Sequence, residues 1–268
     1  MRRSRLSLLA TVLVPMAVLA LTAAPSASAA GASYVALGDS YSSGVGATPY
    51  TSESGSCQRS VRAYSQLWAN THAPTSYRSV ACSGATTVDV TNKQLSALST
   101  STTLVSMTIG GNDVGFSTVI QNCVTGGTTA CVNGVNAAEN SARSILPGRL
   151  DALYSAIRGR SPAARVVALG YPHFYDTSGI FCIGLSTTSR NKINEGADVL
   201  DGIVKSAAAR NGVLFADVRS RFEADHLICD GSSSWLHSLE VTQISSSYHP
   251  NASGYSGGYL PAFAAAAG

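Results

Sequence analysis

The chain has 268 residues, enough for one large α/β domain, and carries 18 lysines and arginines against 15 aspartates and glutamates. Three arginines lie at positions 2, 3 and 5, so the rest of the chain carries 15 residues of each sign, with no run of like charge. This balance gives no support for nucleic acid or an anionic surface as a partner, and we expect no nucleic-acid binding.

The N-terminal segment has the composition of a secretory signal peptide. Its basic start is followed by an apolar run from Leu6 to Leu21 and by the small residues Ala27-Ser28-Ala29. Pro15 within the run, and the lack of basic residues after it, argue against a membrane anchor. We therefore predict a signal peptide over residues 1–29, a single domain over residues 30–268 and a secreted protein.

Five short apolar segments have the composition of strands buried on both faces. They are residues 34–37, 77–81, 104–109, 165–169 and 213–216. Segments of helical character alternate with them or follow them, at residues 61–72, 88–98, 136–158, 187–210 and 251–267. This alternation predicts an α/β fold, a three-layer sandwich with a five-stranded parallel sheet flanked by helices.

Small and polar residues follow each of the first three predicted strands, at Gly38–Ser40, Cys82–Ala85 and Gly110–Asp113. Each cluster alone is typical of an ordinary turn between a strand and a helix. In a parallel sheet, however, all three fall at the carboxyl ends of the strands, where such folds bind ligands. The pattern therefore predicts a site at this edge.

Ser40 is a candidate nucleophile, and a serine hydroxyl needs a base within hydrogen-bonding distance. Histidine is the usual base. Of the five histidines, His173 follows the fourth strand and His249 precedes the closing helix, and placement leaves both as candidates. The backbone N–H of Ser40, the backbone at Gly84 and the side-chain amide of Asn112 are candidate donors to an oxyanion.

These residues stand in the order of the four sequence blocks of the SGNH (GDSL) hydrolase family. The chain resembles that family from Ser33 to its C-terminus, and most closely its secreted actinobacterial lipases and phospholipases A1. The resemblance implies a flavodoxin-like sandwich with Ser40 as nucleophile and His249 as base. It assigns the oxyanion hole to Gly84 and Asn112.

The chain departs from the family next to the histidine. Most members carry aspartate three residues before it, where this chain has Ser246, and no carboxylate lies between Glu240 and the C-terminus. A backbone carbonyl can orient the imidazole instead, although it stabilises the charged ring less than a carboxylate does. The resemblance implies the carbonyl of Ser247, and the carbonyl of Ser246 remains the alternative.

Six cysteines, all after the predicted signal peptide, indicate three disulfides in an exported protein. Metal ligation is less favoured because the chain has no Cys-x-x-Cys motif and no histidine at ligand spacing. Spacing alone favours only one pair, Cys123 with Cys131. The resemblance implies three pairs, which are Cys57–Cys82, Cys123–Cys131 and Cys182–Cys229.

The resemblance implies a carboxylic-ester hydrolase that cleaves fatty-acyl esters of lipids through an acyl-enzyme. Without a metal-binding pattern, we expect no metal and no cofactor. We expect a monomer that binds a lipid or small acyl-ester substrate and contacts a lipid surface transiently. A carbohydrate O-acetyl esterase and a non-catalytic surface-binding module are the alternatives. Aromatic residues on the catalytic edge either line an acyl pocket or pack within the loops: Tyr41, Tyr171, Phe174 and Tyr175.

Overall fold

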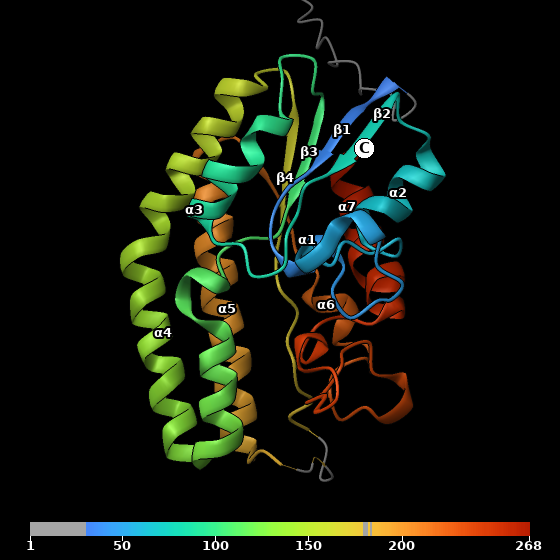
Figure 1. The fold of residues 1–268 in the computed structure, drawn as a ribbon. Helices are drawn as coiled ribbons and strands as arrows, with labels where there is room; N and C mark the ends of the chain where they lie inside the picture. Colours follow the sequence, from blue (N-terminus) through green and yellow to red (C-terminus); the bar gives the residue numbers. More distant parts are fainter. Residues whose placement is uncertain (1–30, 179–181, 183) are drawn as a thin grey trace, which may run out of the picture.

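The computed structural model describes residues 31–178, 182 and 184–268, so the predicted signal peptide lies outside the described residues. A parallel sheet of five strands forms the centre, in the order β2-β1-β3-β4-β5 (Figure 1). The strands are β1 (Ser33–Ala36), β2 (Ser76–Ser79), β3 (Leu104–Met107), β4 (Arg165–Leu169) and β5 (Leu214–Ala216). This arrangement confirms the predicted fold class.

Helices cover both faces of the sheet, with α3, α4 and α5 on one face and α2 and α7 on the other (Figure 1). The α-helices are α1 (Ser40–Ser43), α2 (Tyr64–His72), α3 (Thr87–Asp89), α4 (Phe116–Arg160), α5 (Thr187–Arg210), α6 (Arg219–Phe222) and α7 (Leu260–Ala267). Shorter 3₁₀ and π segments are η2 (Ser52–Cys57), η3 (Val90–Gln94), η4 (Leu95–Ala97), η5 (Asn112–Val114), η6 (Gly231–Ser233), η7 (Ile244–Ser246) and η8 (Gly254–Tyr259).

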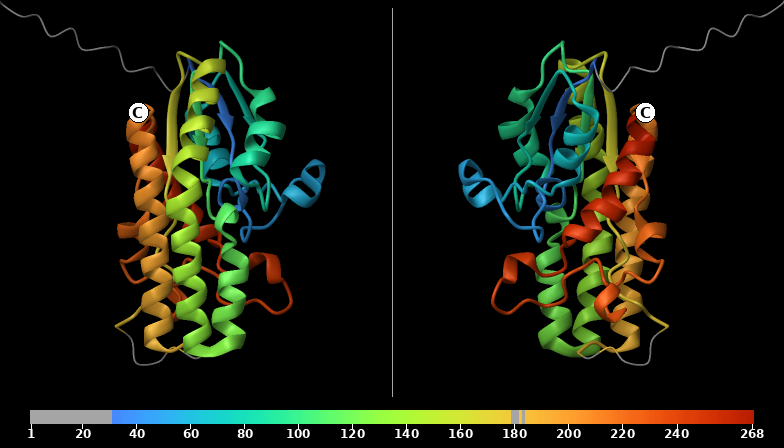
Figure 2. Two further views of the ribbon diagram at one scale, coloured as in Figure 1. Left: turned by 90° about the vertical axis from the view of Figure 1, so that its left-hand side faces the viewer. Right: turned by 90° about the vertical axis from the view of Figure 1, so that its right-hand side faces the viewer.

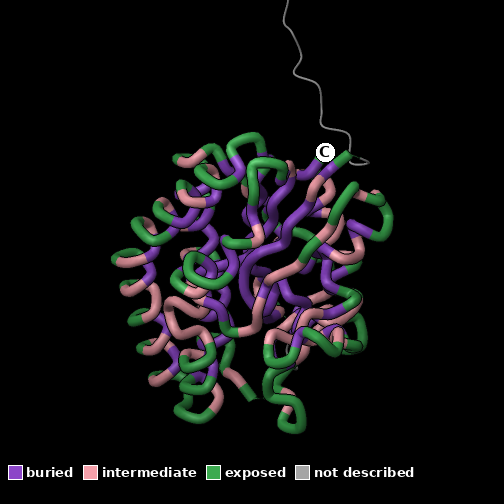
Figure 3. The backbone as a smooth tube through the Cα atoms, turned by 45° about the horizontal axis from the view of Figure 1, so that its top comes forward, coloured by how far each residue is buried: buried purple, intermediate pink, exposed green. Residues whose placement is uncertain are grey.

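The core lies along the sheet, where the central strands are buried and the exposed residues lie on the outer sides of the helices (Figure 3). Every residue of β3 is buried. β2 pairs only with β1, and its residues alternate between exposed and half-buried. The prediction of burial on both faces is therefore wrong for the segment at 77–81, because β2 is an edge strand with one side close to solvent. It is also wrong for the segment at 213–216, because β5 is the other edge strand and its Leu214 is 43% exposed.

Helix α4 is much longer than the segment predicted at 136–158. It consists of two arms, because Gly127 has a non-helical backbone with φ 73° and ψ −175°. The chain reverses there, so the first arm runs back alongside the second (Figure 1). The disulfide Cys123–Cys131 joins the two arms across this turn. Like every other helix in the described part of the chain, α4 is not apolar enough over a sufficient length to cross a membrane.

Candidate active site

The sequence between β1 and α1 presents Ser40 at the carboxyl edge of the sheet. Gly38 has φ 113°, and a Cβ there would lie 2.4 Å from the carbonyl oxygen of Thr108, so only glycine fits. Asp39 caps α1, with its Oδ1 accepting from the N–H of Tyr41 over 3.0 Å. Ser40 is the first residue of this helix and is 7% exposed.

His249 lies against Ser40 although 209 positions separate the two residues in the chain. Its Nε2 is 2.7 Å from the Oγ of Ser40. Its Nδ1 is 3.0 Å from the carbonyl oxygen of Ser247, which can only accept a hydrogen bond. Nδ1 therefore carries the proton, and Nε2 is left as the acceptor for the serine hydroxyl.

The carbonyl of Ser246 has a different partner, since it accepts from the backbone N–H of His249 over 3.1 Å. Of the two carbonyls considered, that of Ser247 is the one that meets the ring nitrogen. Burial lowers the pKa of His249 to about 4, and the hydrogen bond to Ser247 opposes part of that shift. The ring is therefore neutral near pH 7, as a base must be.

His173, the other candidate base, is engaged elsewhere. Its Nε2 lies 2.8 Å from Asp198 and its Nδ1 lies 2.8 Å from Glu223. With a carboxylate at each ring nitrogen, this histidine belongs to a charged cluster beside α5 and α6.

The two predicted oxyanion donors lie in the wall of the same cavity as Ser40 and His249. Gly84 has φ 78°, a conformation that glycine adopts without strain. Asn112 begins η5, and its amide nitrogen donates to the carbonyl of Ala85 over 3.0 Å. That bond uses one of the two amide hydrogens and orients the side chain, which leaves the second hydrogen available to a ligand.

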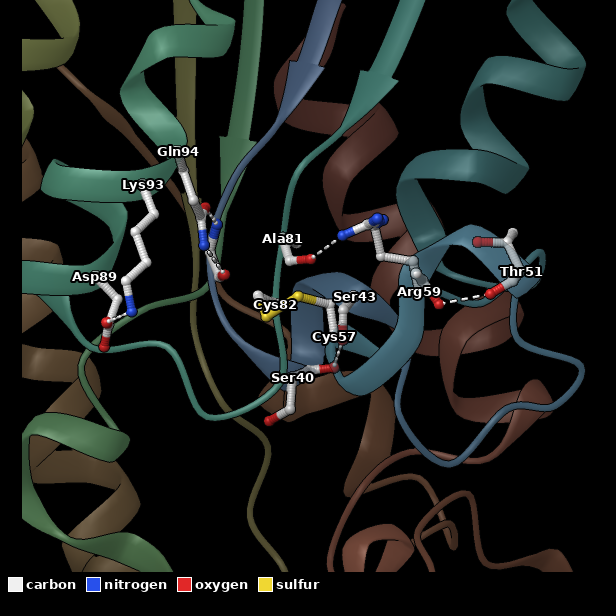
Figure 4. Close-up of a disulfide and its surroundings, with 12 residues drawn as sticks. Ser40, Ser43, Thr51, Cys57, Arg59, Ala81, Cys82, Asp89, Lys93 and Gln94 are labelled. Atoms are coloured by element: carbon white, nitrogen blue, oxygen red, sulfur yellow. Dashed lines mark hydrogen bonds and ion pairs between the residues drawn. A yellow bond between two sulfur atoms is a disulfide. The ribbon is translucent and has the colours of Figure 1, made fainter.

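The disulfide Cys57–Cys82 connects η2 to the loop that carries Gly84 (Figure 4). The backbone N–H of Ser83 also donates to the carbonyl of Cys57 over 3.1 Å. The structure contains the other two expected pairs as well, Cys123–Cys131 and Cys182–Cys229. The cross-link beside Ser40 therefore constrains the backbone on the Gly84 side of the site.

A cavity of about 730 Å³ opens beside Ser40 and extends between α4 and α5. Most of its wall is apolar, and three of the four aromatic residues considered above contribute to it: Tyr41, Tyr171 and Phe174. Tyr175 lies outside the wall, and its hydroxyl donates to that of Tyr248 over 3.2 Å. The cavity is in the size range of small-molecule sites in proteins.

Several residues organise the site through contacts that the sequence does not reveal. The hydroxyl of Tyr171 donates to the buried carboxylate of Asp39 and accepts from the N–H of Gly111 over 3.2 Å. Gln94 makes two hydrogen bonds to the backbone of Gly38, of 2.7 and 2.9 Å (Figure 4). Because Tyr171 follows β4, the sequence places it at the same edge of the sheet as Asp39. Nothing in the sequence indicates the contact between Gln94 and Gly38.

Asp39 is the centre of these contacts and is fully buried. Burial raises its pKa to about 6, against hydrogen bonds from Thr108, Tyr171 and the backbone of Tyr41 that favour the ionised form. The Oγ1 of Thr108 donates to it over 2.6 Å. The carboxyl thus joins the loops that follow β1, β3 and β4 next to the serine.

Comparison with known proteins agrees with this geometry. The GDSL-like Lipase/Acylhydrolase family matches residues 36–256. Lipase 1 of Streptomyces coelicolor is 49% identical, over 100% of both chains. Among solved structures, phospholipase A1 of Streptomyces albidoflavus NA297 is 51% identical, with a TM-score of 0.84 over 88% of this chain and 99% of that one. The extracellular lipase of Streptomyces rimosus is 48% identical, also with a TM-score of 0.84, over 87% and 98%. This chain therefore belongs to the GDSL-like lipase/acylhydrolase family.

Proposed function

We propose that this protein hydrolyses fatty-acyl esters of lipids, as a lipase or phospholipase A1, with Ser40 as nucleophile and His249 as general base. The observation that carries the proposal is the 2.7 Å contact between Oγ and Nε2, with Nδ1 held by the carbonyl of Ser247. The names of the relatives, lipase and phospholipase A1, support the substrate class.

The reaction begins when neutral His249 takes the hydroxyl proton of Ser40 as the oxygen attacks the ester carbonyl. The N–H groups of Ser40 and Gly84 and the amide of Asn112 donate to the resulting oxyanion, and each donor is worth about 3 kcal/mol of barrier. The protonated ring then gives its proton to the departing alcohol. Water, activated by the same histidine, hydrolyses the acyl-enzyme.

The dyad works without a carboxylate partner for the histidine. A carbonyl fixes the tautomer and the ring orientation, which are the functions whose loss is most costly in a serine–histidine–aspartate triad. If Glu240 supplied the missing charge instead, Glu240→Gln would be nearly inactive. We expect Glu240→Gln and Ser246→Ala to keep at least about a third of the wild-type kcat, whereas His249→Ala loses activity by a factor of about 10⁴ or more.

The apolar cavity beside Ser40 supports a fatty-acyl group rather than an acetyl group as the part that is transferred. It is far larger than acetyl needs, and side chains of α4 and α5 form much of its wall.

Within the residues that the structure describes, no cluster of histidine, cysteine, aspartate or glutamate is arranged to hold a metal ion. Because Ser40 and His249 supply a nucleophile and a base, and Gly84 and Asn112 supply oxyanion donors, we infer a reaction carried by the side chains and backbone of the chain itself.

We further infer that residues 1–29 direct export and are removed, and that residues 30–268 act as a single-domain monomer in transient contact with lipid. Three disulfides and the similarity to an extracellular lipase support an extracellular location. Mass spectrometry of protein purified from culture medium tests the cleavage site, and light scattering of the same sample tests the monomer.

A substrate panel with a chelator present tests the proposed function. Triglyceride, phosphatidylcholine and an acetylated sugar are offered to the wild type and to Ser40→Ala, and a fluorophosphonate reports whether Ser40 is a reactive nucleophile. We expect hydrolysis of the two lipids and labelling of the wild type alone. Turnover of the acetylated sugar alone would identify an O-acetyl esterase, and the absence of labelling would identify a non-catalytic module.

A further inference from the structure

Three of the six exposed large apolar side chains in the described part of the chain lie in one loop. Val241 is 82% exposed and Ile244 is 66% exposed, the two highest values among the large apolar side chains that the structure describes. Leu239, in the same loop, is 39% exposed. Single exposed apolar side chains are ordinary, but three within six residues form a patch.

The two ends of this loop, residues 238–247, are fastened together beside the candidate base. The backbone N–H of His237 donates to the carbonyl of His249 over 2.9 Å, and the N–H of Tyr248 donates back to His237 over 3.0 Å. The ring of His237 contacts the carbonyl of Gly46, with 2.8 Å between Nε2 and the oxygen. The loop is therefore closed at its base and attached to the body of the protein.

Hydrogen bonds within the loop give it a defined shape. The N–H of Ser246 donates to the carbonyl of Gln243 over 2.8 Å, and the N–H of Glu240 donates to the hydroxyl of Ser247 over 2.8 Å. In Figure 2 the loop, coloured orange-red, stands out from the body of the molecule. The apolar side chains are thus held outward by a folded turn rather than left exposed by an unfolded segment.

The patch is continuous with the cavity at Ser40. Leu239, Val241 and Ile244 all line that cavity, and a side chain that lines a cavity yet stays largely in solvent lies at its opening. The patch and the side chains of α4 and α5 therefore line one cavity, most of whose wall is apolar. The fatty-acyl chain of the proposed ester substrate is apolar as well, so it matches this wall.

The charges of the region indicate what kind of surface would cover the patch. No lysine or arginine occurs after Arg221, so the loop has no basic side chain to attract anionic headgroups. Its one charged residue, Glu240, lies 3.5 Å from the ring of His237. Apolar contact with an uncharged or zwitterionic surface is what this composition allows.

We propose that the loop 238–247 docks the protein onto a zwitterionic lipid–water surface, by inserting the side chains of Val241 and Ile244 with Leu239 at the edge. This inference rests on the proposed function, because it takes the substrate to be an aggregated lipid. The loop also carries the carbonyl of Ser247 that holds His249. Docking therefore sets the lipid surface next to the dyad, and an ester enters the cavity without crossing water.

Binding to phosphatidylcholine vesicles tests this, with every variant made in the full chain carrying Ser40→Ala so that no lipid is consumed. We expect Val241→Ser/Ile244→Ser to weaken vesicle binding about tenfold or more, and Ile244→Ser alone a few-fold. Leu214→Ser is the matched control for Ile244→Ser, since Leu214 is 43% exposed at the amino end of β5, far from the catalytic edge in the sheet. It should bind like the parent, and all affinities should be the same at low and high salt.

Several results would overturn the inference. They are unchanged binding by the double variant, binding that salt abolishes, and a parent that does not bind vesicles at all. Light scattering adds a fourth, because a parent dimer that the double substitution splits would assign the patch to a second copy of the chain. Thermal unfolding of each variant checks that the fold is retained.

Failure of the proposed function would appear differently. If the wild type cleaves none of the lipid esters while the loop still governs vesicle binding, the substrate is wrong and the docking surface stands. If the wild type cleaves lipids while the double variant binds vesicles normally, the function stands and the docking surface is wrong.

Discussion

The hydroxyl of Tyr41, the residue after the proposed nucleophile, donates a hydrogen bond of 2.5 Å to the carbonyl of Tyr248, the residue before the proposed base. The ring of Tyr41 also lies against the imidazole of His249, with 4.9 Å between centroids. Tyr248 has φ 64°, an uncommon conformation for a residue with a side chain, which its neighbours must maintain. Tyr41 thus helps to fix the position of His249 relative to Ser40.

We expect Tyr41→Phe to lower kcat about tenfold on a soluble ester and to leave KM nearly unchanged. The substitution keeps the ring against His249 but leaves the buried carbonyl of Tyr248 without its donor, at a cost of about 1–3 kcal/mol. The backbone that presents the histidine then loses its fixed position, which affects the reaction more than substrate binding. Steady-state kinetics of the purified variant measures both constants.

Tyr175→Phe is the matched control, because it removes a hydrogen bond to the same residue on the other side. The hydroxyl of Tyr175 reaches the side chain of Tyr248 and not its backbone. We expect this variant to keep its kcat within about twofold. Equal losses in the two variants would show that general loosening around Tyr248, and not the position of its carbonyl, is responsible.

The pH dependence of kcat/KM should show an acid limb well below the usual histidine range. The base acts only when unprotonated, and burial lowers the pKa of His249 to about 4. The rate should therefore stay level as the pH falls through about 6.5 and decline only near 4. Initial rates on a soluble ester between about pH 3.5 and about pH 8 are the measurement. A midpoint near 6.5 would contradict the lowered pKa of His249.

The pH dependence of thermal stability reports the pKa of His249 less directly than the kinetics do. A histidine whose pKa is lowered in the fold supports the native state above about pH 6.5, and that support is lost as the pH falls toward 4. Asp39, with its pKa raised to about 6, acts in the opposite direction, because its support is complete below its ordinary pKa and is lost as the pH rises through 6. The two effects offset one another over much of the same range, so the kinetic limb is the cleaner measurement.

Loss of the Cys57–Cys82 disulfide should reduce activity before it unfolds the sheet. The double variant Cys57→Ser/Cys82→Ser frees the loop that carries Gly84, and we expect kcat to fall about tenfold, with about 3 kcal/mol less stability. Far-UV circular dichroism at room temperature should be unchanged. If activity and the far-UV signal are lost together as a reductant is added to the wild type, the disulfide supports the whole fold and not the oxyanion site.

Cys123→Ser/Cys131→Ser is the control for that experiment. This disulfide joins the two arms of α4 and does not touch the loop at Gly84. Its removal should shift the melting temperature while kcat on a short soluble ester stays within about threefold of wild type. A loss of kcat as large as that of the first double variant would remove the special role of Cys57–Cys82.

Much of the candidate site could be predicted because its residues directly follow strands. Ser40, Gly84 and Asn112 come just after β1, β2 and β3, and a parallel sheet brings such positions to one edge whatever its details. His249 differs, since its placement in a loop before the closing helix set it only slightly ahead of His173, and the family resemblance was needed to single it out. The contacts of the two histidines in the folded chain distinguish them, because His249 meets Ser40 whereas His173 meets two carboxylates. Local sequence does not reveal such long-range contacts.

The first arm of α4 and the contacts of Tyr171 were beyond sequence reasoning. The segment at 116–135 contains adjacent glycines and several threonines, which are weak helix formers. Packing against α5 and the disulfide at Cys123 are tertiary interactions that local propensity does not report. The hydroxyl of Tyr171 likewise finds Asp39 and Gly111 only once three loops have come together. The cavity between α4 and α5 could not be predicted for the same reason, because it forms only when the two helices pack together.

The cavity between α4 and α5 should set the preferred length of the acyl chain. Leu200 lines it beside Gly110, and Ile193 lines it seven residues earlier, about 10 Å along α5. Ala197 lies between them and is 6% exposed, so a larger side chain there occupies the path of a long chain.

For Ala197→Phe we expect the ratio of kcat/KM on a long-chain ester to that on a butyrate ester to fall about tenfold or more, because the ring fills space that only the long chain uses. Ala197→Ser adds a single atom at the same position and should leave the ratio unchanged within about twofold. Paired kinetics on p-nitrophenyl palmitate and butyrate give both ratios. If Ala197→Phe lowers kcat/KM equally for the two esters, the acyl chain lies outside this cavity. The surface at the loop 238–247 is then the next candidate for its binding site.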